Sequence, residues 1–290
     1  MTMEKLNPRL HPFRESIAAS YLKGRVDAQR YSAGQSWQVQ APITGLYRTP
    51  QDDSALDTQA QQGEIFTVYD EQGGWSWGQL ESDNYVGWIR TNHLVSAVEI
   101  PTHKVSVLRT IVFTKPDLKT TPLMMLSLNA SVSIIEQEGD YSRLKSGGWV
   151  FSNHLSSKDE FHQDYVSVAE KFLNAPYLWG GKDSFGLDCS GLVQSSMVAA
   201  GFSVPRDASM QEEAVGTALD IKTALTSLQR GDLIFWPGHV GIMQDAVRLL
   251  HANAHHMMCA SEPVVEAIER IGQKETAVRS IKRPSQLFQS

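Results

Sequence analysis

The stretch Gly186-Leu187-Asp188-Cys189-Ser190-Gly191-Leu192-Val193 decides how the C-terminal part of the chain is interpreted. A glycine-rich loop leads directly into a run whose apolar residues recur at helical spacing as far as Ala200, and Gly201 follows as a helix stop. The pattern predicts a helix over 189–200, with Cys189 in or next to its first turn.

A cysteine at a helix start is set apart chemically from an ordinary buried thiol. Unpaired backbone N–H groups and the positive end of the helix dipole favour a thiolate there. The small pair Ser190-Gly191 lets a substrate carbonyl approach the backbone, so the N–H of Cys189 is a candidate oxyanion donor. Position alone leaves open that Cys189 is an inert core residue, because free cysteine is often buried.

A thiol nucleophile needs a base, and two histidines downstream have suitable settings. His239 lies in Pro237-Gly238-His239-Val240-Gly241-Ile242, after a predicted turn and strand over 230–236. His251 follows twelve residues later, which suits the next antiparallel strand across a short turn. A polar residue there can hydrogen-bond the far ring nitrogen of His239 and select its tautomer. Taken singly, each histidine is also compatible with a structural role.

The remaining C-terminal sequence predicts an α+β domain over 160–290. Residues 164–174 have helical spacing, with Val166, Val168, Ala169 and Phe172 as candidate core positions. Helices come first and most strands come later, which is typical of α+β folds.

The middle of the chain contains an internal repeat. Gly87-Trp88-Ile89-Arg90-Thr91-Asn92-His93-Leu94 recurs 61 residues later as Gly148-Trp149-Val150-Phe151-Ser152-Asn153-His154-Leu155. Upstream, Leu46–Pro50 aligns with Val112–Pro116 at an offset of 66, so the second copy is shorter in its middle. Short alternating runs separated by turns predict two small all-β barrels, over 36–97 and 100–157.

The first 35 residues form an N-terminal arm in this interpretation. Glu15 to Lys23 has helical spacing, with Ile17, Tyr21 and Leu22 on its apolar side, and Gly24 is a plausible stop. The arm shows no unbroken apolar stretch of the kind that a signal peptide carries. We therefore expect a cytoplasmic protein.

Composition excludes several classes of function. The chain has 290 residues and a formal net charge of −6, which disfavours nucleic acid and anionic membranes as partners. Its two cysteines rule out a disulfide scaffold. Cys259, in His255-His256-Met257-Met258-Cys259, lacks a helix start and is expected to be structural. This cluster lacks a second ligand pair at zinc spacing, so we expect no metal and no other cofactor.

The C-terminal motifs resemble the NlpC-type family of bacterial cell-wall cysteine peptidases, which have a papain-like fold. Six motifs occur in the family's order: Tyr177-Leu-Trp179-Gly-Gly, Asp188-Cys189-Ser190-Gly191, Pro205-Arg206-Asp207-Ala208-Ser209-Met210-Gln211, Arg230-Gly231-Asp232-Leu233, Gly238-His239-Val240-Gly241-Ile242 and His251. The repeated Gly-Trp-(Ile/Val) and Asn-His-Leu motifs, with the Trp75-Ser-Trp77 hairpin, resemble bacterial SH3-like domains. The fold expected from these resemblances is a papain-like peptidase domain after two SH3-like barrels.

The resemblance implies Cys189 as nucleophile, His239 as general base and acid, and His251 as the orienting residue. The order Cys before His is that of the ordinary branch of the family. The whole arrangement is similar to intracellular γ-D-glutamyl-L-diamino acid endopeptidases that recycle murein peptides. It implies a small peptide substrate, a murein stem tri- or tetrapeptide.

The resemblance also implies a set of substrate contacts. In such enzymes acidic and tyrosyl groups bind the free amine of the N-terminal L-Ala, which suits a buried ammonium. The residues that correspond are Asp188, Glu64 and Tyr85, with Ser190, Ser209 and Tyr177 as further contacts. Gln62 and Asn84 depart from the family's usual pattern next to Glu64 and Tyr85.

Two other functions compete with this interpretation. One is an exported cell-wall hydrolase or amidase of the same family, which would act on intact sacculi. The other is a non-catalytic wall-binding protein whose barrels carry the function. The sequence leaves open the preferred diamino acid, meso-diaminopimelate or lysine, and the role of the arm, and we expect a monomer.

Overall fold

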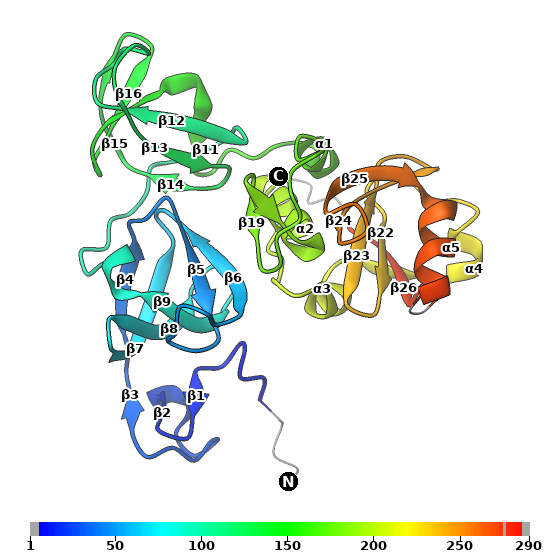
Figure 1. Cartoon of the computed structure of the whole chain (residues 1–290), viewed down its shortest axis with the longest axis horizontal. Coiled ribbons are helices and arrows are strands. Elements are labelled where there is room, and N and C mark those ends of the chain that lie inside the picture. Colours follow the sequence, from blue (N-terminus) through cyan, green and yellow to red (C-terminus); the bar gives the residue numbers. More distant parts are fainter. Residues whose placement is uncertain (1–5, 275–276, 286–290) are drawn as a thin grey trace. The chain divides into compact units, whose positions relative to one another are not determined.

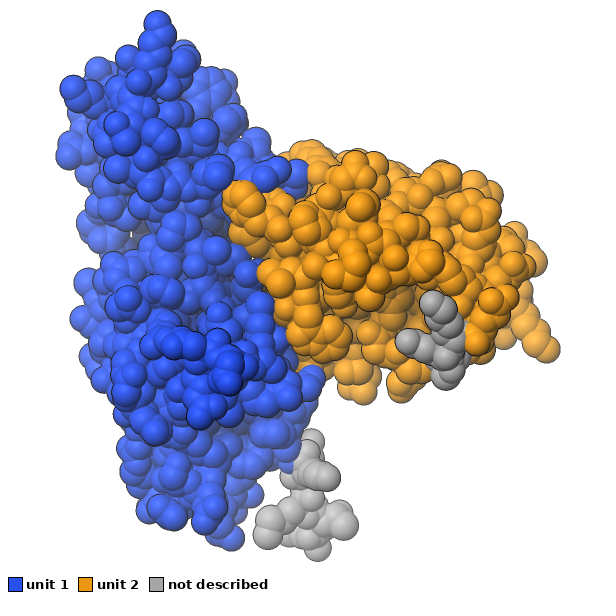
Figure 2. Space-filling view, viewed as in Figure 1, with its two compact units in different colours: residues 1–159 blue, residues 160–290 orange. Residues whose placement is uncertain are grey.

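The computed structural model describes residues 6–274 and 277–285 and divides the chain into two compact units, residues 1–159 and 160–290 (Figure 2). Unit 1 is built of strands, and unit 2 combines helices with one antiparallel sheet (Figure 1). This is the predicted combination of an all-β region followed by an α+β domain. Among the described residues, no helix combines the length and the apolar character needed to cross a bilayer.

The N-terminal arm forms a small sheet in place of the predicted helix over Glu15–Lys23. Its strands run in the order β1-β2-β3, and within residues 6–35 of the arm only the 3-10 turn η1 is helical. The elements are β1 (Phe13–Arg14), β2 (Ile17–Ala19), η1 (Ser20–Leu22) and β3 (Tyr31–Ser32). Every residue of β2 is fully buried, so both of its faces are covered. The helical spacing was misleading because tertiary packing overrides weak local propensity.

The arm packs against the outside of the first β-domain. Its apolar residues Ile17, Ala19 and Leu22 form one core cluster with the aromatic side chains of the following strands: Tyr69, Trp75, Trp77 and Trp88. The guanidinium of Arg14 lies over the rings of Trp77 and Trp88, 4.6 and 4.7 Å from their centroids. Cation–π contact and apolar burial together hold the arm in place.

The first β-domain is one seven-stranded sheet in the order β10-β4-β7-β8-β9-β5-β6. Its elements are β4 (Gln35–Val39), β5 (Ile43–Tyr47), β6 (Leu56–Gln61), β7 (Ile65–Gln72), β8 (Trp75–Leu80), β9 (Val86–Arg90), η2 (Thr91–His93) and β10 (Leu94–Val95). Alternate residues point inward to a core that includes Leu46, Phe66 and Ile89.

The second β-domain repeats this strand order in two pieces, β14-β11-β18 and β13-β12-β17-β16-β15. Its elements are β11 (His103–Val105), β12 (Arg109–Phe113), β13 (Pro122–Ser127), β14 (Ser131–Val132), β15 (Ile134–Glu138), β16 (Tyr141–Leu144), β17 (Trp149–Phe151), η3 (Ser152–His154) and β18 (Leu155–Ser157). The pair β14 and β15 stands where the first domain has the single strand β7. The shortening predicted in the second copy lies in the turn before the Gly-Trp strand.

The two copies share side-chain contacts as well as strand order. The histidine of each Asn-His-Leu motif contacts a threonine hydroxyl: His93 Nδ1 lies 2.7 Å from Thr44 Oγ1, and His154 Nδ1 lies 2.8 Å from Thr110 Oγ1. Each contact joins the 3-10 turn to the second strand of its domain. The repeated motif is therefore a structural clamp.

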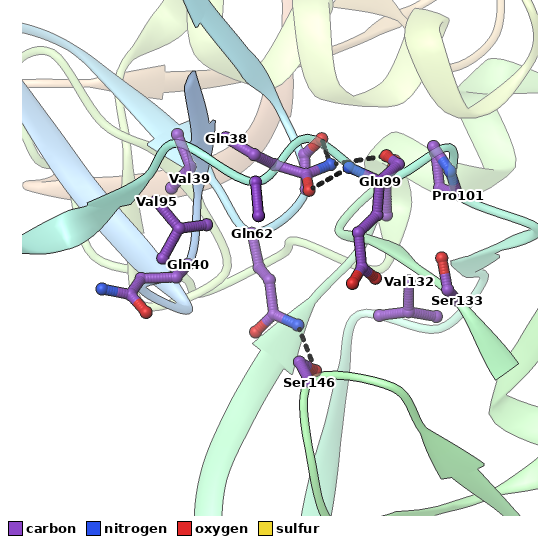
Figure 3. A pocket seen from close by; sticks show the side chains of 13 residues that line it. Gln38, Val39, Gln40, Gln62, Val95, Glu99, Pro101, Val132, Ser133 and Ser146 are labelled. Carbon is purple, nitrogen blue, oxygen red and sulfur yellow. Dashed lines mark hydrogen bonds between the residues drawn. The ribbon is translucent and has the colours of Figure 1, made fainter. Parts of the chain in front are cut away.

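The two β-domains meet at a junction that lines an open pocket of about 280 Å³. The N–H of Ser131 donates to the carbonyl of Gln62 across it, at 2.9 Å. Figure 3 shows the amide of Gln62 donating to Ser146, and that of Gln38 donating to the carbonyl of Glu99. Gln62, one of the two residues that depart from the expected pattern next to Glu64 and Tyr85, is thus part of this junction.

Unit 2 is a six-stranded antiparallel sheet in the order β21-β26-β22-β23-β24-β25, with helices against it (Figure 1). Its elements are α1 (Tyr165–Glu170), β19 (Lys182–Asp183), β20 (Gly186–Leu187), α2 (Cys189–Ala199), α3 (Ala208–Ala214), β21 (Thr217–Leu219), α4 (Ile221–Ala224), β22 (Leu233–Trp236), β23 (His239–Met243), β24 (Arg248–Asn253), β25 (Met258–Pro263), α5 (Val264–Lys274) and β26 (Ser280–Arg283). Helix α2 is the one predicted, and α1 is shorter than the predicted 164–174 although its candidate core residues are buried.

The Arg230-Gly231-Asp232 motif ties this unit together. Asp232 is fully buried and accepts two hydrogen bonds from Arg283 of β26, at 2.7 and 2.8 Å. Arg230 pairs with Asp164, the N-cap of α1, and with Glu170 in the same helix. The motif therefore fixes the start of β22, the strand that leads into the turn before His239.

Candidate active site

Helix α2 begins at Cys189, and its start is built by Asp188. The side chain of Asp188 caps the helix by accepting the N–H of Gly191 at 2.7 Å. The same carboxylate accepts hydrogen bonds from the N–H of Gly180, at 2.9 Å, and from Arg206, at 2.7 and 3.0 Å. Asp188 is thus primarily the cap and the partner of a fully buried arginine.

Two glycines let the loop before Cys189 approach the helix closely. A Cβ on Gly191 would lie 2.1 Å from the carbonyl oxygen of Gly181, and one on Gly181 would lie 2.3 Å from that of Gly186. The carbonyl of Gly181 also accepts the N–H of Asp188 and one N–H of Arg206. Close packing of backbone on backbone explains the glycines of both motifs.

The Cys189 thiol lies against the backbone on either side of His239. Its Sγ is 4.0 Å from the carbonyl oxygen of Gly238 and accepts a hydrogen bond from the N–H of Val240. Burial, and after it the Asp188 carboxylate, raise the pKa of Cys189 to about 12, against the N–H groups of Val240 and Ser190, which lower it. Desolvation of the Cys189 thiol therefore opposes the thiolate that a helix start favours.

His239 is the first residue of β23, directly after the Pro237-Gly238 turn that joins it to β22. Gly238 has φ of +74°, which the tight turn requires. Burial, and after it the neighbouring His251, lower the pKa of His239 to about 3. The imidazole is therefore neutral at physiological pH, as a general base must be.

A hydrogen-bonded relay extends from His239 across three strands. Its Nε2 lies 2.8 Å from Nδ1 of His251 on β24, and Nε2 of His251 lies 2.7 Å from Oε1 of Glu262 on β25. Glu262 in turn pairs with Arg270 of α5. The strand register puts these three side chains on one face of the sheet, at diagonal positions of successive strands.

The charge at the end of the relay sets every tautomer in it. Burial alone would raise the pKa of Glu262, but the bond from His251 and the charge of Arg270 lower it, so this group is a carboxylate. Burial lowers the pKa of His251, which is therefore neutral and donates its Nε2–H to Glu262. Its Nδ1 then accepts from Nε2–H of His239, and the lone pair of His239 is left on Nδ1.

Glu262 and Arg270 were not predicted from the sequence. They belong to β25 and α5, after the hairpin, and no local motif surrounds them. The alternation of β25 contains a signal for Glu262. Glu262 lies two residues after Ala260, the residue opposite His251, so its side chain is on the same face of the sheet as that of His251. The register of that hairpin could not be read from the sequence, so the link was missed.

The other predicted site residues fall into two groups. Within unit 2, the Ser190 hydroxyl donates to Asp188 and accepts from Arg206, and Ser209 is exposed on α3. Burial raises the pKa of Tyr177, and Cys189 and Asp188 raise it further, which puts its hydroxyl in the neighbourhood of the thiol.

Glu64 and Tyr85 belong to unit 1. Both oxygens of the Glu64 carboxylate accept hydrogen bonds there, from the N–H of Gln61 and from the Ser82 hydroxyl, each at 2.6 Å. Tyr85 is a buried member of the first β-domain core. Their contact with substrate stays a prediction.

A thiol at a helix start, beside a neutral histidine that a second polar side chain orients on an antiparallel sheet, defines a papain-like cysteine peptidase. Comparison with protein families matches residues 174–270 to the NlpC/P60 family and residues 46–94 to the bacterial dipeptidyl-peptidase SH3 domain. The chain thus carries an NlpC/P60 peptidase domain preceded by an SH3-like all-β region.

Several known proteins are similar to this chain. A γ-D-glutamyl-L-lysine dipeptidyl-peptidase of Bacillus subtilis is 28% identical over 69% of this chain and 73% of its own length. One of the same name from Bacillus cereus is 30% identical over 62% of this chain and 60% of its own. A solved NlpC/P60 family protein from Bacillus cereus has a TM-score of 0.71 at 20% identity, covering 86% of this chain and 99% of that one. This last likeness confirms the fold.

Proposed function

We propose that this protein is a cysteine endopeptidase that hydrolyses the γ-D-glutamyl–L-diamino acid bond of peptidoglycan stem peptides with a free N-terminal L-Ala. The observation that carries the proposal is the position of the Cys189 thiol, which lies at the start of α2 and against the backbone on either side of His239. The imidazole of His239 is in turn oriented by His251. The names of the two Bacillus relatives supply the bond, and their similarity extends beyond the peptidase domain.

Acylation begins when Nδ1 of His239 takes the thiol proton of Cys189. The sulfur attacks the γ-carbonyl of D-Glu, and a C–S bond forms as the carbonyl becomes an oxyanion. The N–H of Cys189 at the helix start, and the Tyr177 hydroxyl, are the candidate donors to that oxygen. When the C–N bond breaks, the imidazolium gives its proton to the leaving amine of the diamino acid.

Deacylation uses the same groups in the opposite direction. Nδ1 of His239 removes a proton from water, and the resulting hydroxide attacks the thioester. The C–S bond breaks, the proton returns to the Cys189 sulfur, and the L-Ala-D-Glu dipeptide leaves with a free γ-carboxyl. Throughout, His251 and Glu262 keep the proton of His239 Nε2 in place, which keeps Nδ1 available.

Recognition of the free amine is the finer part of the proposal. Asp188, Glu64 and Tyr85 are the candidates to bind the ammonium of L-Ala. Because Asp188 already accepts N–H groups on both oxygens, an ammonium would share it with Arg206. Lysine, named in the Bacillus relatives, is the first diamino acid to test.

The test compares L-Ala-γ-D-Glu-L-Lys with the same tripeptide acetylated at its N-terminus. We expect cleavage of the free peptide and a large loss of kcat/KM on acetylation, because a neutral amide cannot replace a buried ammonium. A Glu64→Gln variant should lose part of that preference. Equal cleavage of both peptides would contradict the amine requirement without touching the assignment of Cys189.

We also propose that the enzyme acts as a monomer in the cytoplasm, on peptides already detached from the glycan. Fractionation of cells expressing the tagged chain, with a light-scattering mass for the purified protein, tests both statements. Cleavage of intact sacculi at a rate comparable with free peptides would favour the exported hydrolase instead.

A further inference from the structure

Two histidines and one glutamate meet at the β24–β25 hairpin: His251, His256 and Glu262. One ligand-type atom from each lies within 4.8 Å of the other two. We call these residues the hairpin cluster. Two of them belong to the relay, whereas His256 takes no part in it.

His256 is held in the orientation that a metal ligand needs. The amide oxygen of Asn253 accepts the backbone N–H of His256 at 2.9 Å and lies 3.0 Å from its Nδ1. Because an amide oxygen only accepts, Nδ1 carries the ring proton and Nε2 keeps its lone pair. Metal-binding histidines are fixed in this way by a partner at their other nitrogen.

The donor set favours one class of ion. Two imidazoles and a carboxylate suit Zn²⁺, whose bonds to nitrogen and oxygen are about 2.0–2.2 Å long and which accepts a water as fourth ligand. The proposal requires the side chains of His256 and Glu262 to close around Nε2 of His251, while His251 keeps its contact with His239. Arg270 opposes the ion, because it already pairs with Glu262, so we expect moderate affinity.

We propose that the hairpin cluster is an inhibitory Zn²⁺ site that reverses the relay of the catalytic histidines. Zn²⁺ binds Nε2 of His251 in place of the proton on that nitrogen, and His251 then carries its ring proton on Nδ1. His251 Nδ1–H then donates to His239 Nε2, whose own proton moves to Nδ1 of His239. Two ring protons are present before and after, and no proton is released from the pair. Nδ1 of His239, the base of the proposed peptidase, then carries a proton and cannot accept the one from the thiol.

Binding is tested first, in a way that does not depend on the proposed function. Calorimetry with Zn²⁺ is carried out on Cys189→Ala protein, which removes the competing thiol. We expect one zinc per chain, and at least about tenfold weaker binding when His256→Ala is added, in line with loss of one ligand. His255→Ala is the matched control, because this neighbouring exposed histidine lies outside the hairpin cluster. Equal binding by the His255 and His256 variants would overturn the proposal.

A second readout needs no variant of the hairpin cluster. X-ray absorption of zinc-loaded Cys189→Ala protein should show two imidazoles and only nitrogen or oxygen ligands. A sulfur ligand, which only Cys259 could supply in that protein beyond its methionines, would contradict the site.

The inhibitory part rests on the proposed function, and it is measured as zinc inhibition of tripeptide cleavage, each variant relative to its own zinc-free rate. The His256→Ala enzyme should need about tenfold more zinc for half-inhibition than the wild type or the His255→Ala enzyme. Zinc binding at the hairpin cluster without any such difference would refute the reversal of the relay. Absence of any cleavage would refute the proposed function and leave the binding result standing.

Discussion

The carboxylate of Glu262 determines which ring nitrogens of His239 and His251 carry the protons. Two neutral imidazoles in contact can share a proton in either order, and only a charged acceptor at one end selects one of them. Glu262 supplies that charge at 2.7 Å from His251, and Arg270 keeps it ionised. The lone pair of His239 is thereby placed on the nitrogen that has no bond to His251.

Removing this carboxylate should therefore lower the rate of the chemical step. We predict that Glu262→Ala lowers kcat by about 10- to 100-fold with little change in KM, as is typical when a partner that orients a functional histidine is lost. Glu262→Gln keeps an acceptor and should lose less. Glu266→Ala, an exposed glutamate of α5, is the control, and similar kcat values for all variants would refute the role of Glu262.

The Cys189 thiol should remain protonated in the resting enzyme well into the alkaline range. Its pKa is raised to about 12, compared with about 8.5 for a free thiol, because burial disfavours the thiolate. A raised pKa stabilises the folded protein below about pH 8.5, and this contribution is lost as the pH rises towards 12.

The check is a titration of the thiolate ultraviolet absorbance, with Cys189→Ala protein subtracted. We expect no signal from Cys189 at neutral pH or near pH 8.5. A thiolate already present near neutral pH would mean that an imidazolium partner outweighs desolvation, and that the resting site is an ion pair.

At this scale, much of the candidate site could be predicted. Cys189, His239 and His251 sit in local motifs whose spacing reports a helix start and two adjacent strands. Glu262 could not be found, because it reaches His251 through the register of a hairpin that the sequence does not reveal. The roles of Asp188 and Ser190 were predicted from resemblance alone, and burial of Arg206 beneath them was not anticipated.

Helix α2 depends on the close approach of the loop before it. The carbonyl of Gly181 accepts two hydrogen bonds around the helix start, from the N–H of Asp188 and from Arg206. The same carbonyl oxygen would lie 2.1 Å from a Cβ placed on Gly191. Neither backbone can move without disturbing the cap on which Cys189 sits.

We predict that Gly191→Ala destabilises the protein by about 1–3 kcal/mol, the usual range for overpacking, and lowers activity with it. Gly272→Ala in α5 is the matched control, because its Cβ would meet nothing within 4 Å. That substitution should stabilise by about 0.5–1 kcal/mol, since alanine loses less entropy in a helix. Urea unfolding measures both, and equal stabilities would contradict the packing argument.

The arm shows where prediction at the level of elements failed. Residues Glu15–Lys23 have helical spacing, yet Ile17–Ala19 forms a strand that is buried on both sides. Its partners lie at Phe13–Arg14 and Tyr31–Ser32 and on the tryptophans of the first β-domain. Contacts so distant in sequence are invisible to local periodicity.

On the scale of the whole molecule, the repeat was the most informative feature of the sequence. The two β-domains have the same strand order and the same histidine–threonine clamp. The recurrence of Asn-His-Leu in the sequence therefore indicated a repeated structural unit. The domain boundaries 36–97, 100–157 and 160–290 stay predictions, beside the division after residue 159 that the structure shows.

The central claim is that Cys189 cleaves the γ-D-glutamyl bond of a stem peptide. Mass spectrometry of the products from L-Ala-γ-D-Glu-L-Lys, with wild-type and Cys189→Ala protein, tests it most directly. The account predicts L-Ala-D-Glu and free lysine from the wild type, and no products from Cys189→Ala. Cleavage at another bond, or the same products from the Cys189→Ala protein, would contradict it.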